Sequence, residues 1–251
     1  MRAGLYRYIT MRLSNVSFRY RRRDQSVIRD VNSQVSPGDV IELSGVNGAG
    51  KSTLLRLLAG LISPTTGTIT GRPAVVGLAP DRFPIEQPFT VAGYLDHMAR
   101  ARGGARWQPW AERLTMNHLL DVRLGELSKG SAHKVGLAQA LMAEPGLLLL
   151  DEPFAGLDAD TRDALPPIVA DLSARGVVVV ASDHQGGLGV LPSVRHWSLR
   201  DGVLRETAQA APALPESVTV EVTLPAGEVT TFVQRMRAEG YAARELTEES
   251  R

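Results

Sequence analysis

The sequence reads Gly45-Val46-Asn47-Gly48-Ala49-Gly50-Lys51-Ser52-Thr53 between an apolar segment, residues 40–43, and an amphipathic one, residues 53–59. The first segment predicts a short buried strand and the second a helix that stops at Gly60. A glycine-rich loop in this context, ending in Lys and Ser, is typical of phosphate binding. Its backbone N–H groups and the helix N-terminus favour an anion, while Lys51 can reach the terminal phosphates and Ser52 can ligate Mg²⁺. We therefore predict a nucleotide site that contains Gly45, Asn47, Gly48, Ala49, Gly50, Lys51, Ser52 and Thr53.

Composition limits the alternatives. The 251 residues, 43% of them hydrophobic, suffice for one large domain or for one domain with a small appendage. A formal net charge of +1 gives no sign of a nucleic-acid partner, and the lack of cysteine excludes disulfides and Cys-ligated metals. The longest apolar runs, residues 147–150 and 177–181, are far shorter than the roughly 20 residues of a membrane-spanning helix. Residues 1–10 lack the apolar core of a secretory signal, and Met11 is a second candidate for the initiator.

Strand and helix signals alternate along the chain, which predicts an α/β fold with a mainly parallel sheet. We expect strands near residues 13–18, 40–43, 74–79, 147–150 and 177–181, and a hairpin around Asp201-Gly202. Residues 84–127 contain Trp107 and Trp110 and have helical spacing without a clear strand, so they predict an inserted helical subdomain. The predicted organisation is a nucleotide domain at 11–208, a linker at 209–216 rich in Ala and Pro, and a small β-α-β appendage at 217–251.

A second site element is the apolar segment 147–150, which ends in Asp151-Glu152. Open α/β sheets bind ligands at the carboxyl ends of their strands. Asp151 can therefore hold Mg²⁺ beside the phosphate loop, and Glu152 can orient or deprotonate the water that attacks the γ-phosphate. The alternative, that both carboxylates only cap the next turn, does not account for the four preceding leucines.

Between these elements, Leu127-Ser128-Lys129-Gly130-Ser131 leads into a helical segment. Residues 13–206 here resemble the ATPase subunit of an ABC transporter, whose signature is usually written LSGGQ. Ala155-Gly156-Leu157-Asp158 resembles the D-loop, His184 the switch histidine, and Tyr20 the aromatic residue that stacks on adenine. Tyr20 could equally pack on the sheet as a strand aromatic, and His184 could be an ordinary core or surface histidine.

The resemblance implies a P-loop NTPase fold of ABC type, with an N-terminal antiparallel β part. It also implies a head-to-tail dimer, formed with a second copy or a paralogous subunit, that encloses two ATP molecules. Ser128, Gly130 and Asp158 then face the partner's nucleotide, while His184 contacts the γ-phosphate.

Three departures from the family pattern stand out. Lys129 replaces a signature glycine, as in signatures of exporter-type ATPases. Pro166-Pro167 should kink or split the helix expected after the D-loop. Asp81 replaces the usual Gln, which links Mg²⁺ and water to the helical subdomain; an ionised Asp only accepts hydrogen bonds and is one methylene shorter.

The resemblance implies an enzyme that converts ATP and water to ADP and phosphate with Mg²⁺. Its catalytic residues are Glu152, His184 and Asp81, and Ser52, Asp151 and Asp81 are its metal ligands. The chain would power a separate transmembrane permease, an exporter, from the cytoplasmic face of the cell membrane. A cytosolic ABC ATPase without transport, or a regulatory module with little turnover, stays open as an alternative.

Overall fold

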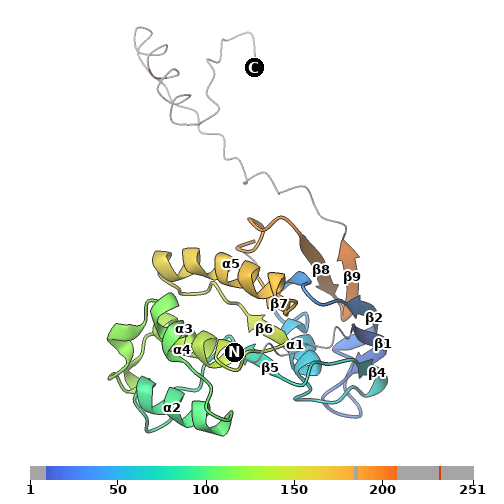
Figure 1. The fold of residues 1–251 in the computed structure, drawn as a ribbon. Coiled ribbons are helices and arrows are strands. Elements are labelled where there is room, and N and C mark those ends of the chain that lie inside the picture. The colour runs from blue at the N-terminus through green and yellow to red at the C-terminus, as the bar shows by residue number, and fades with distance from the viewer. Residues whose placement is uncertain (1–9, 184–185, 208–231, 233–251) are drawn as a thin grey trace. The chain divides into compact units, whose positions relative to one another are not determined.

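The computed structural model describes residues 10–183 and 186–207, together with residue 232 (Figure 1). In these ranges the chain folds as a six-stranded, mainly parallel sheet, a three-stranded antiparallel sheet and helices that cover them. The predicted α/β class with an antiparallel N-terminal part is confirmed. The predicted linker 209–216 and nearly all of the appendage 217–251 lie outside the described residues, as does His184.

The main sheet has the strand order β5-β6-β7-β3-β8-β9. Its members are β3 (Val40–Ser44), β5 (Val76–Ala79), β6 (Leu147–Asp151), β7 (Val178–Ser182), β8 (Val194–Arg200) and β9 (Val203–Thr207). All neighbours run parallel except β8 and β9, which form the predicted hairpin. The carboxyl ends of β3 and β6, which carry the phosphate loop and the acidic pair, therefore point to one edge of the sheet.

The leucines of β6 pack against the hydrophobic cores on both faces of this sheet. Leu148 and Leu150 belong to the core under the helical part of the chain, whereas Leu147 and Leu149 pack on the opposite side with helix α1 (Lys51–Ala59). Because side chains alternate along a strand, a strand covered on both faces is apolar at every position. Helix α1 ends at Gly60, as predicted; Gly60 has a φ of 76°, a left-handed conformation that glycine adopts without strain.

The antiparallel sheet has the order β2-β1-β4 and consists of β1 (Met11–Phe18), β2 (Ile28–Val35) and β4 (Thr66–Thr70). Only the first of these strands is predicted from the sequence. In β2 the buried residues are Ile28, Val31 and Val35, because register shifts against β1 break the alternation. That spacing is typical of a helix.

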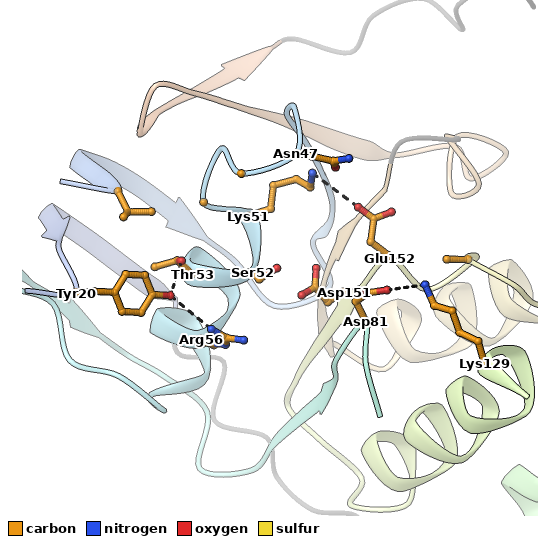
Figure 2. Close-up of a pocket in the computed structure, with 14 residues that line it drawn as sticks. Tyr20, Asn47, Lys51, Ser52, Thr53, Arg56, Asp81, Lys129, Asp151 and Glu152 are labelled. Atoms are coloured by element: carbon orange, nitrogen blue, oxygen red, sulfur yellow. Dashed lines mark hydrogen bonds and ion pairs between the residues drawn. The ribbon is translucent and has the colours of Figure 1, made fainter. Parts of the chain in front are cut away.

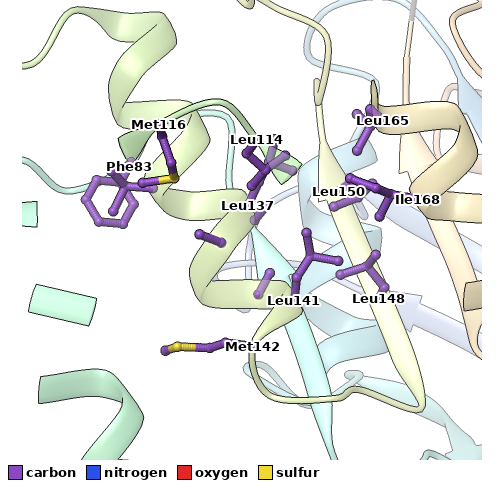
Figure 3. Packing of buried hydrophobic residues seen from close by; sticks show 14 of the residues in the cluster. Phe83, Leu114, Met116, Leu137, Leu141, Met142, Leu148, Leu150, Leu165 and Ile168 are labelled. Carbon is purple, nitrogen blue, oxygen red and sulfur yellow. The ribbon is translucent and has the colours of Figure 1, made fainter. Parts of the chain in front are cut away.

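The helical subdomain holds α2 (Val91–Ala101), α3 (Gln108–Arg113) and 3-10 turns at Asn117–Leu119 and Leu124–Glu126, followed by α4 (Lys129–Leu141). The predicted lack of strands holds for residues 84–127, all of which are described. Trp107 is buried and donates its Nε1 hydrogen to Asp96 at 2.8 Å, so it belongs to the subdomain core. Figure 3 shows this core continuing from Phe83 and Leu137 to Leu148 on the sheet.

Helix α5 (Ala159–Ala174) is continuous, although Pro166 and Pro167 lie inside it. Of the two predicted effects of the prolines, a kink or a split, the split is wrong. Leu165 and Ile168 are buried on either side of the prolines and hold both halves against the sheet. The carbonyls that lose their intrahelical donors are four residues earlier, at Arg162 and Asp163, which are exposed and can be hydrated. Within the described ranges, no helix is long and apolar enough to cross a membrane.

Candidate nucleotide site

The phosphate loop follows β3 and leads directly into α1. Gly50 has a φ of 103°, and a Cβ atom there would lie 2.9 Å from a methyl carbon of Val27, so both conformation and space require glycine. The buried Lys51 donates a hydrogen bond from Nζ to the carbonyl oxygen of Gly45 at 2.8 Å. Its Nζ also lies 3.7 Å from Oε1 of Glu152, which brings the two predicted site elements together (Figure 2).

A cavity of about 700 Å³ opens at this edge of the sheet. This volume lies within the range of small-molecule sites. The predicted residues that line the cavity are Tyr20, Asn47, Gly48, Gly50, Lys51, Ser52, Thr53, Asp81, Asp151 and Glu152. Gly45 and Ala49 do not line it; a Cβ atom at Gly45 would lie only 2.5 Å from the carbonyl oxygen of Leu199, so Gly45 allows the loop to approach β8.

Ser182, at the end of β7, positions both members of the acidic pair. Its hydroxyl donates to Oδ1 of Asp151 at 2.7 Å and accepts from the backbone N–H of Glu152 at 3.0 Å. Glu152 itself has a φ of 54°, which is uncommon for a residue other than glycine and costs conformational energy. The surrounding hydrogen bonds hold this backbone so that the Glu152 side chain points toward Lys51 (Figure 2).

Tyr20 also lines the cavity, on the side of the phosphate loop away from Glu152 (Figure 2). Its hydroxyl is 2.9 Å from Oγ1 of Thr53 and accepts a hydrogen bond from Arg56 at 3.4 Å. The ring packs edge-on against Phe18, with 5.0 Å between centroids, and is more than half exposed. The ring therefore borders the cavity and also packs on Phe18 of β1, and the stacking of Tyr20 on adenine stays a prediction.

The family model described as ABC transporter matches residues 28–155, just over half of the chain. The chain belongs to the ABC transporter family. It is 36% identical over 193 residues to the zinc import ATP-binding protein ZnuC of Halorhodospira halophila, and the aligned region covers 75% of this chain and 73% of ZnuC. It is 41% identical over 174 residues to the aliphatic sulfonates import ATP-binding protein SsuB of Mycobacterium avium, and this alignment covers 64% of this chain and 67% of SsuB.

Among solved structures, one described as the ATP-binding subunit of an ABC transporter superposes with a TM-score of 0.70 at 26% identity, covering 78% of this chain and 89% of that one. Our chain is thus an ATP-binding subunit of an ABC transporter, an ATPase whose activity is coupled to transport. The predicted export direction finds no support, because the relatives are named as import proteins.

In this ABC ATPase the signature segment contacts the D-loop segment of the same chain at several points. A Cβ atom at Gly130 would lie 2.0 Å from the carbonyl oxygen of Gly156. One turn further along α4, Nζ of Lys134 lies 2.6 Å from Oδ2 of Asp158. Asp158 also caps α5, and the hydrogen bonds from Lys134 and then Thr161 hold the pKa of this carboxyl well below its ordinary range.

Ser128 caps α4 by accepting a hydrogen bond from the backbone N–H of Ser131 at 3.1 Å. Neither Ser128, Gly130 nor Asp158 lines the cavity of its own chain. Their predicted contact with a partner's nucleotide stays a prediction, as do the catalytic and metal-binding roles given above.

Four residues that line the cavity are absent from the predicted site: Val27, Arg56, Lys129 and Ala155. Val27 immediately precedes β2 and Arg56 lies on the exposed side of α1, and no sequence motif marks either residue. Lys129 could have been found from the sequence, because it is one of only three lysines in the chain. Its Nζ lies 3.2 Å from Oδ1 of Asp81 (Figure 2).

A further ionisable group lies under the phosphate loop. Glu42 on β3 is buried, and its Oε2 lies 3.4 Å from Nδ1 of His196 on β8. Burial, with a smaller contribution from the negative charge of Asp183, raises the pKa of Glu42 to about 7. The strand that delivers the loop therefore carries a carboxyl group that titrates near neutral pH.

Proposed function

We propose that this ATPase subunit binds Mg²⁺-ATP in the cavity and dimerises head to tail around two nucleotides, and that the cycle of ATP binding and hydrolysis drives a membrane permease. The observation that carries the proposal is the convergence of Lys51, Glu152 and Asp151 at one cavity, from elements about 100 residues apart. In its working position the subunit is peripheral, on the cytoplasmic side of the membrane.

Each group has a task that follows from its chemistry. The loop N–H groups and Lys51 bind the phosphates, with Thr53 and Tyr20 toward the base. Ser52 and Asp151 supply the oxygen ligands that Mg²⁺ prefers, and Mg²⁺ neutralises charge that develops on the phosphates. Lys51 must exchange the Glu152 carboxylate for phosphate when ATP binds, which frees Glu152 to orient the attacking water.

The dimer is supported by the position of the signature. Ser128 and Gly130 do not line the chain's own cavity, although Lys129 between them does, so a nucleotide that these two residues contact is expected to belong to another subunit. The direction of transport is inferred to be import, from the names of the relatives. Zinc and aliphatic sulfonates differ in charge and size, so similarity between the ATPase subunits does not identify the transported substrate.

Glu152→Gln tests this proposal. The variant keeps the shape of the side chain and removes its basicity, so it should bind ATP, lose turnover and accumulate as a dimer in light scattering with Mg²⁺-ATP. Lys51→Ala should lose ATP affinity in calorimetry, and Glu144→Gln, at an exposed carboxylate outside the cavity, should behave as wild type. Normal hydrolysis by Glu152→Gln would remove Glu152 from its role. ATP-independent dimerisation would reject the nucleotide sandwich.

The permease requires a separate test. Co-expression of the chain with a candidate permease should give a complex whose ATPase rate exceeds that of the free subunit. Cells that contain this complex should take up the substrate of the permease, and the Glu152→Gln variant should abolish that uptake. ATP-dependent release of the substrate from the cells would instead support export.

A further inference from the structure

All three lysines of the chain pair with carboxylates in or beside the nucleotide site. The pairs, with their nitrogen-to-oxygen distances, are Lys51–Glu152 (3.7 Å), Lys134–Asp158 (2.6 Å) and Lys129–Asp81 (3.2 Å). The first joins two elements of the cavity, and the second fixes the signature helix to the start of α5. The third has no place in the function proposed above.

Lys129 is the first residue of α4, and its side chain is 63% exposed. It reaches from the signature helix toward Asp81, which follows β5, and both residues line the cavity (Figure 2). Arg82 also approaches Asp81, at 4.0 Å, but its side chain is 94% exposed and does not line the cavity. Lys129 is therefore the cation that meets Asp81 on the nucleotide side.

The negative charge of the cavity wall explains why the contact between Lys129 and Asp81 matters for ATP binding. Asp81, Asp151 and Glu152 place three carboxylates along one wall, and the ligand is itself a polyanion. Lys51 is the only lysine of the phosphate loop and already approaches Glu152. A carboxylate at position 81 without a nearby cation would repel the terminal phosphates, because like charges a few ångströms apart disfavour each other even near the surface.

We propose that Lys129 is a nucleotide-positioning residue of its own chain, with Asp81 as its counterion. Its ammonium group cancels the charge of Asp81, so the cavity accepts a triphosphate beside three carboxylates. The two departures from the family pattern, Asp for Gln and Lys for Gly, then compensate each other. The inference rests on ATP binding in this cavity, as proposed above.

The test is a double-mutant cycle on ATP affinity at low ionic strength, measured by calorimetry with wild type, Lys129→Ala, Asp81→Asn and the double variant. Lys129→Ala should weaken ATP binding about two- to fivefold, as expected for the loss of one largely exposed charge. Asp81→Asn should bind ATP at least as tightly as wild type. The double variant should recover most of the loss, because neither charge then remains.

Arg82→Ala is the matched control and should leave ATP affinity unchanged. Repeating the titrations with ADP and adenosine adds a readout that a structural role would not change, since the Lys129→Ala loss should shrink with each phosphate removed. A double variant as weak as Lys129→Ala, or an equal loss for adenosine and ATP, would overturn the inference. Absent ATP binding by the wild type would instead refute the proposed function.

Discussion

Asp158→Asn should destabilise this ATPase more than Lys134→Met, although the two changes break the same ion pair. The Lys134 side chain is only 3% exposed, whereas that of Asp158 is 54% exposed. Asn keeps the cap on α5, because its side-chain oxygen accepts the same hydrogen bond from Thr161. The change therefore isolates the loss of negative charge from the loss of the cap.

The magnitudes follow from which charge is left behind. Asp158→Asn leaves a buried ammonium whose other hydrogen-bond acceptor within reach is Oγ1 of Thr115 at 3.2 Å. Breaking a buried pair in this way costs about 3 kcal/mol of unfolding free energy, at the low end of the known range because Asp158 is half hydrated. Lys134→Met leaves a carboxylate that water can solvate, in a site of similar volume, and should cost about 1 kcal/mol.

Urea unfolding without nucleotide, followed by tryptophan fluorescence, measures the difference. The midpoint of Asp158→Asn should lie below that of Lys134→Met at equal m values, and the double variant should match Lys134→Met. A Lys134→Met variant that is the less stable of the two would refute the reasoning, because the cost would then come from packing and not from charge.

Two further predictions concern backbone contact and pH. Gly130→Ala should lower the thermal midpoint of unfolding and the ATPase rate together, because the new Cβ atom would lie 2.0 Å from the carbonyl oxygen of Gly156. Overpacking of this kind costs about 1–3 kcal/mol. A midpoint equal to that of wild type would show that the signature and D-loop segments separate freely. The pKa of Glu42 is raised from 4.5 to about 7 in the folded state, so the folded state binds this proton more tightly than the unfolded state does. The protonated side chain therefore contributes its whole stabilisation of the fold below pH 4.5, and this contribution is lost as the pH rises through 7. Wild type should therefore lose up to about 3 kcal/mol relative to Glu42→Gln between pH 4.5 and 7.5, measured by urea unfolding; parallel pH profiles would assign Glu42 an ordinary pKa.

The strongest local patterns predicted both elements of the nucleotide site. The register of glycines, Lys51 and Ser52 between a strand and a helix is a local property, and so is the buried strand that ends in Asp151. Strands β2 and β4 were missed, because bulges against β1 disturb the alternation of β2 and small polar residues make up much of β4. Their apolar positions have meaning only once β1 lies between them.

The sequence by itself determined that this chain binds phosphate, because loop, strand and helix there are set by neighbouring residues. Only the tertiary structure decided which distant groups complete the site. Lys129 meets Asp81, and Ser182 meets Asp151, because parallel strands end at one edge and α4 packs beside it. The continuity of α5 across two prolines was decided in the same way, since burial on both sides of a breaker holds a helix that local preference would interrupt.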